Sequence, residues 1–380
     1  MHLTIALNSK ILRAPRTGIG NYVVELAQEL QQNPGLRMQY FSGFDWHGKL
    51  ATGAMPGYSR CAGAAKRFLP SAYALRRIVE QQCFNLGIRR IRPDVYHEPS
   101  LWPLEFDGPT VMTIHDLTHL HYPQTQPADR LQEIERRLPS ALTRSSRILV
   151  VSEFIGQEVR RHFGLSDKKV VVAPSGCSDV FHPREEHQLS ASLQKLGLHY
   201  RGFILSVGTL EPRKNLLLTL KAHARLSPAA RARFPLLVVG MAGWRTDELT
   251  GVLSQAVNSG YVRLAGYLDQ QDLAAVTAAA RVMVFPSLYE GFGLPVLEAM
   301  ASGTPVITSS GSSMEEVAAG AGTYVDPQDE VGLTEKIRQL LEDDGVWTAS
   351  RTAGLERSHE FSWAKSAAIT ADVYRQASES

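Results

Sequence analysis

Short apolar runs alternate along the chain with longer segments in which apolar residues recur every three or four positions. The short runs are rich in Val, Ile and Leu, as buried strands are, and the longer segments have the period of amphipathic helices. This alternation predicts an α/β protein in which helices connect the strands of parallel sheets. The expected strands are 3–7, 38–43, 95–97, 111–115, 147–152, 169–174, 203–208, 236–240, 261–266, 282–287, 304–309 and 322–326, with helices such as 21–32, 129–143, 215–224 and 269–280 between them.

A polar stretch after Pro183 separates two series of alternating strands and helices of similar size. It has no strand pattern before Phe203, so we expect a domain boundary there, with domains at 1–182 and 183–360. The last segment, 361–380, predicts an amphipathic helix. Ligands of parallel sheets bind beyond the carboxyl ends of the strands, so residues that follow strands are the first candidates for a site.

The composition is that of a globular protein, with 44% hydrophobic and 21% charged residues. No apolar run approaches the roughly 18 residues of a membrane-spanning helix, and we expect the first residues to form a strand rather than a signal peptide. Three widely spaced cysteines, Cys61, Cys83 and Cys177, fit neither a disulfide framework nor a zinc site and indicate a reducing cytoplasm. The net charge is +6 over residues 1–185 and −4 over residues 186–380, which suggests different partners for the two halves.

Two glutamates, Glu290 and Glu298, flank a glycine-rich turn between an expected strand and an expected helix. We expect Pro295 at the first helical position, where its missing N–H is harmless, and Gly303 at the end of the helix. The glycines of the turn allow backbone N–H groups to approach a ligand, and the start of a helix favours an anion. The stretch around Gly293 therefore predicts a phosphate site formed by main-chain amides.

The two carboxylates predict what surrounds that phosphate. Glu298 lies about one turn into the expected helix, and its carboxylate can accept hydrogen bonds from a ribose diol, as an acidic residue does in dinucleotide folds. Glu290 lies on the loop, where a carboxylate would repel a phosphate, so we expect it to contact a neutral hexose. Together they indicate a nucleotide sugar. The alternative, a strand–helix crossover with two surface glutamates, remains open on the pattern alone.

A pair of cations, Arg213 and Lys214, follows the expected strand 203–208. Two adjacent cations can neutralise a leaving diphosphate. Because the helix dipole disfavours cations at a helix start, we expect this pair to bind an external anion. The chain contains no Asp-x-Asp motif, which favours chemistry without a metal ion. The alternative is a solvated basic pair that opens a helix.

Two motifs of the first half also follow strands. The sequence Thr-Gly-Ile-Gly at 17–20 predicts a turn before a helix that begins near Asn21, which is a weaker signal than a full dinucleotide fingerprint and is often only structural. His115 and Asp116 come at the end of strand 111–115, where a lone histidine is more often structural than catalytic. Two further histidines, at 119 and 121, lack a set of partner ligands, so we expect no metal site.

Four segments, in this order, resemble the motifs of the retaining family 4 glycosyltransferases: GIGNY (18–22), TIHDL (113–117), SVGTLEPRKN (206–215) and YEGFGLPVLEAMASGTPVI (289–307). The resemblance implies the GT-B fold, an α/β architecture of two Rossmann-like domains whose parallel sheets face each other across a cleft. It implies that the N-terminal domain binds the acceptor and the C-terminal domain the nucleotide-sugar donor. It also implies that the helix at 361–380 crosses back to the N-terminal domain, and that no metal or other cofactor is required.

The resemblance also assigns roles to individual residues. Those expected to act at the reacting sugar are His115, Asp116, Arg213, Lys214 and Glu290. Those expected to bind the donor are Gly18, Gly20, Gly208, Gly240, Tyr267, Leu268, Gly291, Phe292, Gly293, Leu294 and Glu298. The loop at 18–20 is expected to close over the donor phosphate and to contact the acceptor. Main-chain groups near 267–268 are expected to hold the base, which leaves no side-chain signature of its identity.

The motif variants resemble those of bacterial mannosyl- and rhamnosyltransferases of surface polysaccharide assembly. We therefore expect transfer of a hexose, either mannose or a deoxyhexose such as rhamnose, from a GDP-linked donor. The expected acceptor is a lipid-linked glycan in lipopolysaccharide O-antigen biosynthesis. A UDP- or dTDP-linked donor remains an alternative. A sugar-nucleotide epimerase on the same two-domain scaffold and a protein that only senses a nucleotide are the alternative functions.

The stretch 65–93 combines seven basic residues and one acid with interleaved apolar residues. Basic and apolar residues at helical spacing suit an anionic membrane surface, although a solvated helix face with its apolar side in the core explains them equally well. We expect a cytoplasmic protein with peripheral contact to the inner face of the cell membrane. No nucleic-acid partner is expected.

Overall fold

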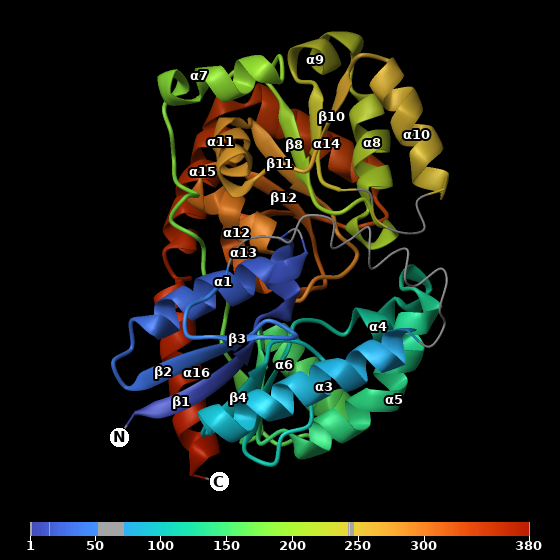
Figure 1. Ribbon diagram of the computed structural model, residues 1–380. Helices are drawn as coiled ribbons and strands as arrows, with labels where there is room; N and C mark the ends of the chain where they lie inside the picture. The colour runs from blue at the N-terminus through green and yellow to red at the C-terminus, as the bar shows by residue number, and fades with distance from the viewer. Residues whose placement is uncertain (1, 15, 52–71, 242, 244–246, 380) are drawn as a thin grey trace. The chain divides into compact units, whose positions relative to one another are not determined.

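The computed structural model describes residues 2–14, 16–51, 72–241, 243 and 247–379, without the side chains of 72–76, 190–192 and 247–248. These residues form two compact units, each built around its own sheet (Figure 1). The first unit comprises Met1–Leu117, Gln132–Gly176 and Trp363–Ser380, and the second comprises Thr118–Leu131 and Cys177–Ser362.

The sheet of the first unit has the strand order β3-β2-β1-β4-β5-β6-β7 and is parallel except for β3, which runs antiparallel to β2. The chain builds one side of the sheet from β1 to β3 and then begins the other side with β4. The strand order therefore reverses between β1 and β4, and the residues that end these two strands lie together at the carboxyl edge. The strands are β1 (Leu3–Asn8), β2 (Leu36–Phe41), β3 (Trp46–His47), β4 (Val95–Glu98), β5 (Thr110–Ile114), β6 (Arg147–Val150) and β7 (Val170–Val172).

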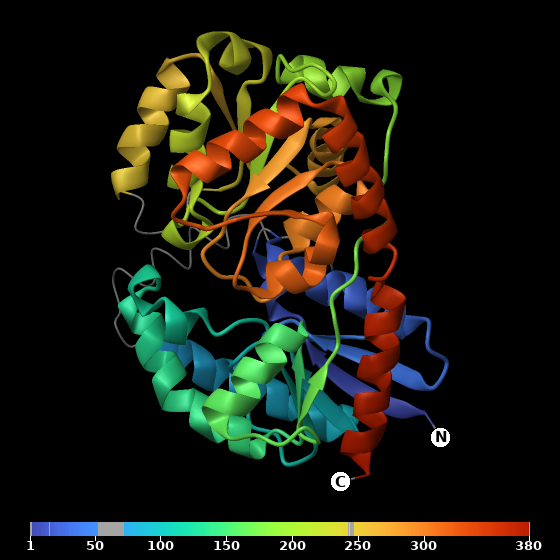
Figure 2. The same ribbon diagram turned by 180° about the vertical axis from the view of Figure 1, so that it is seen from behind.

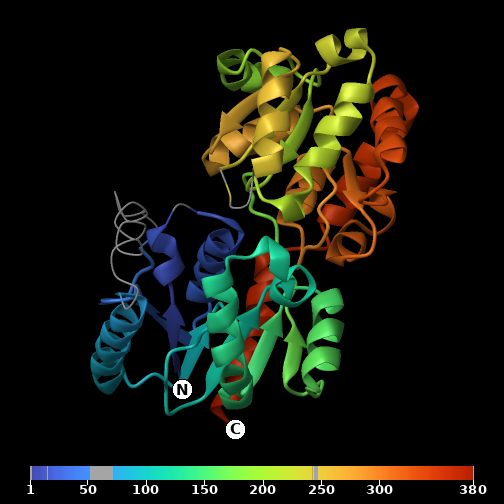
Figure 3. The same ribbon diagram turned by 90° about the vertical axis from the view of Figure 1, so that its right-hand side faces the viewer.

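Helices cover both faces of this sheet (Figure 3). The last helix, α16 (Trp363–Ser378), packs against α1 (Gly18–Gln31) and lies along β4, β5 and β6 (Figure 2). On α3 (Ala72–Ile91), Phe84 packs with Phe41 and Tyr96 in an apolar cluster. Further helices are the 3-10 helix η1 (Lys10–Arg13), α5 (Ala128–Arg144), whose first residues belong to the second unit, and α6 (Glu153–Phe163).

The sheet of the second unit is parallel throughout, with the strand order β10-β9-β8-β11-β12-β13. Its strand order reverses between β8 and β11, so the loops that follow these two strands meet at the carboxyl edge. The strands are β8 (Ile204–Val207), β9 (Leu236–Val239), β10 (Val262–Gly266), β11 (Val282–Phe285), β12 (Val306–Ser309) and β13 (Thr323–Val325).

One apolar cluster holds the second sheet to α8 (Leu216–Arg225), α10 (Asp247–Asn258) and α14 (Glu330–Glu342). In it Ile204, Val238 and Ile307 from the strands meet Leu218 and Ile337 from the helices. The other helices described in this unit are α4 (Thr118–His121), η2 (Pro123–Thr125), α7 (Glu186–Lys195), η3 (Pro212–Lys214), α9 (Pro228–Arg233), α11 (Gln270–Ala279), α12 (Leu294–Ala301), α13 (Ser313–Ala318), η4 (Ala319–Ala321) and α15 (Asp344–Ser358).

The strands expected from the apolar runs are all present, with ends that differ by one or two residues, and β3 is an addition. The expected turn at 17–20 was wrong. Thr17 is the extended residue before α1, with φ of −125° and ψ of −174°, so Gly18 and Gly20 lie in the first turn of the helix. Pro295 is the second residue of α12 rather than the first. Gly303 follows the end of α12 with φ of 74°, as expected.

Within the part of the chain that the structure describes, no helix is both long and apolar enough to span a bilayer.

Candidate active site

The loops that follow β8 and β11 are joined through the backbone of Arg213. Its carbonyl oxygen accepts a hydrogen bond from the Leu288 N–H at 2.8 Å and another from the Ser287 hydroxyl at 3.0 Å. Asn215, which has a left-handed φ of 55°, donates its side-chain amide to the Pro286 carbonyl oxygen at 3.0 Å. The structure thus brings the LEPRKN and YEGFG segments together at the reversal point of the sheet.

The side chains of these two loops form a network of ion pairs. Glu290 accepts Lys214 Nζ at 2.7 Å on one carboxylate oxygen and Arg213 Nη1 at 3.0 Å on the other. Arg213 also pairs through Nη2 with Glu211 Oε1 at 2.7 Å. Glu211 and Glu290 balance the charge of the two cations, so the pair does not depend on an external anion for neutralisation. The expected binding of an external anion stays a prediction. Arg213 is buried, so it is not part of a solvated basic pair.

The ionised state of Glu290 depends on its neighbours. Its side chain is buried, and residue exposure is 7%. Burial raises the pKa of this carboxyl, but the charges of Arg213 and Lys214, with hydrogen bonds from Lys214 and Ser287, lower the pKa to about 2. Glu290 therefore keeps its negative charge at neutral pH and holds both cations in place.

Two serines that were not predicted as site residues orient Glu290. The Ser287 hydroxyl donates to Glu290 Oε1 at 2.6 Å, and the Ser313 hydroxyl donates to the Glu290 carbonyl oxygen at 2.7 Å. Glu211 lies inside a segment that was recognised, but no role was given to it. Ser287 and Glu211 both come shortly after strands, which was the one signal in the sequence. Many serines and glutamates occupy such positions, so the signal does not single these two out.

The start of α12 requires a glycine. Gly293 precedes the helix with φ of 87°, and a Cβ there would lie 2.9 Å from Met314 Cγ, so both the conformation and the space require glycine. Phe292 is buried, with its ring centroid 5.6 Å from that of Phe361. Glu298 is on the same helix and is also buried, so it is not a surface glutamate.

Two predicted donor-binding glycines lie at the carboxyl ends of adjacent strands. Gly208 follows β8 and Gly240 follows β9, with φ values of 148° and 157°. A Cβ on Gly240 would lie 1.8 Å from the Gly208 carbonyl oxygen, so the two backbones approach more closely than any other residue would allow. This contact alone requires glycine at 240, whatever binds there.

Tyr267 and Leu268 directly follow β10 on the same edge of the sheet. The Tyr267 side chain is exposed and Leu268 is partly buried. The carbonyl oxygen of Gly266 before them accepts the Gly240 N–H at 2.8 Å, which ties this loop to the strand-end glycines. Their proposed contact with a base remains a prediction.

The first unit holds the other predicted residues. His115 follows β5, and its Nε2 lies 3.0 Å from the Pro99 carbonyl oxygen. Because a carbonyl oxygen only accepts hydrogen bonds, Nε2 carries the proton. The Tyr22 ring meets His115 edge-on, with 4.7 Å between centroids. Burial lowers the pKa of His115, although the Pro99 carbonyl and Asp116 act to raise it, so the ring is neutral at pH 7.

A polar cluster that the sequence analysis did not identify lies at the reversal point of the first sheet. Glu98 is the last residue of β4 and is buried, and its Oε2 accepts Asn8 Nδ2 and the Tyr96 hydroxyl, each at 2.7 Å. The Ser100 hydroxyl donates to its other oxygen at 2.6 Å. A signal for this cluster was present, since Asn8 and Glu98 are polar residues that directly follow the predicted strands 3–7 and 95–97.

The segment Thr118–Leu131 contacts the loop that follows β11 in the second unit. The Tyr122 hydroxyl donates to the Leu288 carbonyl oxygen at 3.3 Å. The rings of His121 and Tyr122 lie 5.1 and 5.9 Å from the Tyr289 ring, measured between centroids. These aromatic residues therefore contact Leu288 and Tyr289, which directly precede Glu290 in the sequence. Among the described residues, no group of three or more His, Cys, Asp or Glu is placed to hold a metal ion.

Both halves of the chain match known sequence families. Residues 16–179 match the family described as Glycosyltransferase Family 4, and residues 192–357 match the family described as Glycosyl transferases group 1. Over 379 residues the chain is 32% identical to O-antigen chain mannosyltransferase B of Escherichia coli, and this match covers 98% of the chain and 100% of that protein.

Solved structures share the fold over the full length. Sucrose-phosphate synthase (tll1590) from Thermosynechococcus elongatus matches with a TM-score of 0.75 at 22% identity, covering 99% of each chain. Alr3699/HepE from Anabaena, solved in complex with UDP-glucose, matches with a TM-score of 0.72 at 16% identity, covering 99% of this chain and 100% of that one. At such identities the likeness concerns the fold alone, and that fold is the expected GT-B.

Proposed function

Because the chain belongs to the family 4 glycosyltransferases, we propose that it transfers a hexose from a nucleotide sugar to a growing surface polysaccharide with retention of configuration. The proposed donor is GDP-linked mannose, or a GDP-linked deoxyhexose such as rhamnose. The proposed acceptor is a lipid-linked glycan in lipopolysaccharide O-antigen assembly. The name of the relative that matches the whole chain, O-antigen chain mannosyltransferase B, supports mannose and O-antigen.

One observation carries the proposal, the pairing of Lys214 with Glu290 beside the turn that precedes α12. A lysine ammonium has three N–H donors, so Lys214 can bind Glu290 and a phosphate oxygen at the same time. The four charged side chains Glu211, Arg213, Lys214 and Glu290 sum to zero. A bound diphosphate would therefore depend on directed hydrogen bonds from Lys214 and from main-chain amides at 292–294 more than on excess positive charge.

These contacts support a proposed role for each group in the transfer. As the bond between the anomeric carbon and the phosphate oxygen breaks, negative charge develops on the diphosphate, where Lys214 and the helix start stabilise it. The acceptor oxygen forms its bond to the anomeric carbon on the same face, and its proton passes to the leaving phosphate oxygen. Glu298 would bind the ribose. This route requires no metal ion.

The test replaces the lysine. We expect Lys214→Ala to lower kcat by about 100-fold, corresponding to about 3 kcal/mol of lost transition-state stabilisation. Lys221→Ala, an exposed lysine seven residues further along, is the matched control and should keep full activity. The assay uses a lipid-linked glycan acceptor with GDP-, UDP- and dTDP-sugars in EDTA, and NMR reads the anomeric configuration of the product. Near-normal turnover by Lys214→Ala would contradict the role.

The same assay separates the alternative functions. An epimerase on this scaffold would convert the donor when no acceptor is present, and NMR of the donor alone would detect it. A nucleotide sensor would bind donor without turnover. HepE, which shares the fold, was solved in complex with UDP-glucose. A UDP-linked donor is therefore the main alternative to a GDP-linked one, and the assay includes it.

We further propose that the first unit contacts an anionic membrane surface through α3. Of the predicted stretch 65–93, residues 65–71 lie outside the described residues, as do the side chains of 72–76. In the remainder, Ile78 and Leu86 are 58% and 68% exposed, and they are accompanied by the exposed Arg89 and Arg90. Exposed aliphatic and basic residues on one helix support peripheral contact with a cytoplasmic leaflet.

A further inference from the structure

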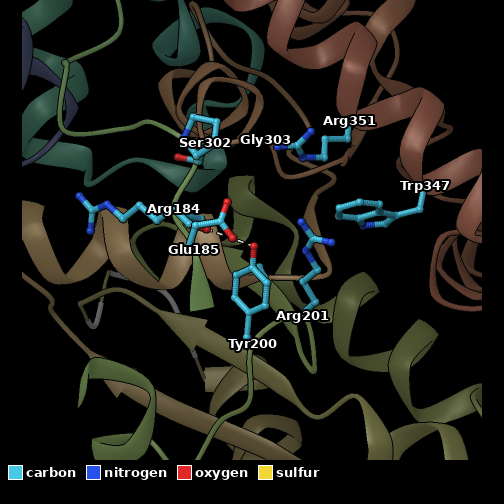
Figure 4. A pocket seen from close by; sticks show the side chains of 11 residues that line it. Arg184, Glu185, Tyr200, Arg201, Ser302, Gly303, Trp347 and Arg351 are labelled. Atoms are coloured by element: carbon cyan, nitrogen blue, oxygen red, sulfur yellow. Dashed lines mark hydrogen bonds between the residues drawn. The ribbon is translucent and has the colours of Figure 1, made fainter. Parts of the chain in front are cut away.

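A second polar pocket lies in the second unit, at the opposite end of α12 from the candidate active site. The active-site end of α12 begins at Leu294, and the pocket reaches Ser302 and Gly303 just after the helix ends. Eight residues at 1.5 Å each separate the two ends by about 12 Å. The pocket has a volume of about 30 Å³. Figure 4 shows Arg201 and Arg351 near Trp347, whereas the Arg184 side chain points away from them.

Three arginines line this pocket, and they come from separate segments: Arg184 before α7, Arg201 before β8, and Arg351 on α15. Within the described residues, neither Arg201 nor Arg351 has a carboxylate at ion-pair distance. Arg281, which is nearby, differs from them because its charge is balanced by an ion pair with Asp344 at 2.7 Å. The one acidic lining residue, Glu185, is exposed, so the pocket carries excess positive charge.

The guanidinium of Arg201 is held in position by its surroundings. It lies over the Trp347 ring, with 4.4 Å from Cζ to the ring centroid, and 5.0 Å from the Tyr200 ring centroid. The backbone of Arg201 has a left-handed φ of 54°, and its N–H donates to the Ala279 carbonyl oxygen at 2.7 Å. A bulky residue adopts this conformation at a cost, so the surrounding contacts hold the side chain in the pocket.

The base of the pocket contains a buried hydroxyl and a glycine. Ser302 is 2% exposed, and among the described residues its hydroxyl has no hydrogen-bond partner. Buried hydroxyl groups without partners are rare because desolvation is costly. Gly303 has φ of 74°, and a Cβ there would lie 3.2 Å from Arg351 Nε, so glycine leaves room around this guanidinium. Trp347 and Arg351, four residues apart on α15, face the pocket together.

We propose that this pocket binds a single phosphate group. Two arginines without carboxylate partners and one buried hydroxyl are the donors that a tetrahedral oxyanion accepts, and guanidinium groups are well suited to phosphate. The space of about 30 Å³ holds about two water-sized groups, so part of the phosphate would lie at the mouth of the pocket. The site differs from the proposed donor site because it lies at the opposite end of α12. The phosphate is either inorganic phosphate or the terminal group of a phosphomonoester whose remainder lies outside the pocket.

A purely structural role makes a different prediction. Arg351 lies at the carboxyl end of α12, where a cation interacts favourably with the helix dipole. If this were its only role, replacing it would lower stability but leave phosphate binding unchanged. Phosphate binding is therefore the property that distinguishes the two roles.

The experiment titrates inorganic phosphate into the full chain by calorimetry at constant ionic strength. We expect Arg351→Gln to weaken binding at least about tenfold, the loss of one charge-assisted hydrogen bond. Arg338→Gln, an exposed arginine on α14 that already pairs with Glu335, is the matched control and should bind as the wild type does. Lys214→Ala should also bind phosphate normally at this pocket, which separates it from the donor site.

Ser302→Ala provides a second variant in case Arg351→Gln does not fold, and we expect it to weaken phosphate binding as well. A parallel titration with glycerol phosphate distinguishes the two sources. If glycerol phosphate binds more tightly, the ligand is an organic phosphomonoester. If inorganic phosphate binds more tightly, the ligand is the free ion. Either result supports the site. No binding up to about 50 mM phosphate, equal binding by the wild type and both pocket variants, or loss in Lys214→Ala alone overturns the proposal.

Discussion

At the scale of single residues, Glu290 connects the two loops of the candidate active site. It contacts a lysine and an arginine 76 and 77 positions away in the sequence, and both of its oxygens are occupied. Such a network fixes the cations before any substrate arrives. Its strength has a measurable signature, because a buried carboxylate with a lowered pKa stabilises the folded protein only while it is ionised.

This gives a prediction for the pH dependence of stability. The folded pKa of Glu290 is about 2, below the ordinary value of 4.5. Its contribution is therefore fully present above pH 4.5 and is lost as the pH falls through 2. The shift corresponds to about 3 kcal/mol. We expect the difference in unfolding free energy between wild type and Glu290→Gln to shrink by about that amount from pH 5 to pH 2, measured by urea denaturation.

The control for this prediction is Glu335→Gln, which removes an exposed carboxylate that pairs with Arg338 on α14. An exposed ion pair contributes little to stability, so this variant should differ little from the wild type at any pH. A difference between wild type and Glu290→Gln that stays constant from pH 5 to pH 2 would contradict the assigned cause.

The sequence could place Arg213, Lys214 and Glu290 in one site because each follows a strand, and the carboxyl ends of parallel strands share an edge. It could not show that Glu290 pairs with the cations. That pairing depends on side-chain directions across two loops distant in the sequence, and on Ser287 and Ser313, which have no distinctive pattern. The expectation that Glu290 contacts a neutral hexose took no account of the two cations that pair with it.

At the scale of elements, hydrophobic periodicity was sufficient to predict every long strand, because strands buried on both faces are continuous apolar runs. It was insufficient for β3, a two-residue edge strand, and for the start of α1, where the extended backbone of Thr17 rather than the glycines marks the boundary. Strand ends depend on individual hydrogen bonds, which periodicity does not record.

The element α3 carries the prediction about membranes. Its inner side places Phe84 in the core, while Ile78 and Leu86 face solvent. We expect the protein to float with vesicles that contain anionic lipid at low salt. Ile78→Glu combined with Leu86→Glu should reduce the bound fraction at least about tenfold, since each exposed aliphatic side chain contributes about 1 to 2 kcal/mol on burial.

The matched control for this experiment is Val331→Glu, which replaces an exposed aliphatic residue on α14 in the second unit. It should leave flotation unchanged. If the wild type fails to bind anionic vesicles at low salt, or if the control loses binding to the same extent, the surface of α3 is an ordinary solvated helix face.

At the scale of the whole molecule, the two units are built from discontinuous pieces of chain. Both sheets could be predicted from the sequence because the strand–helix alternation occurs twice. The inclusion of 118–131 in the second unit could not be predicted, since nothing in that short segment indicates which sheet it contacts. The last helix, α16, belongs to the first unit and packs on elements formed by the N-terminal part of the chain.

The contact between α16 and the first sheet includes one buried polar chain. His97 on β4 is fully buried, with Nδ1 2.6 Å from the Tyr374 hydroxyl and Nε2 2.8 Å from Thr113 Oγ1. Burial, with a smaller contribution from His115, lowers the pKa of His97 to about 3, so the ring is neutral and needs one donor and one acceptor as partners. Tyr374 supplies one of them across 277 positions of sequence.

Removing that hydroxyl should therefore destabilise the first unit selectively. We expect Tyr374→Phe to cost about 1 to 3 kcal/mol, because one nitrogen of a buried histidine loses its partner and no water replaces it. Hydrogen exchange should become faster in β4 and β5 of the first unit and remain unchanged in β8 and β11 of the second. Tyr267→Phe, which removes a solvent-exposed hydroxyl, is the control and should alter neither. Equal acceleration in both sheets would mean that α16 stabilises the molecule as a single cooperative body, and unchanged exchange in both would mean that the His97 contact contributes nothing measurable.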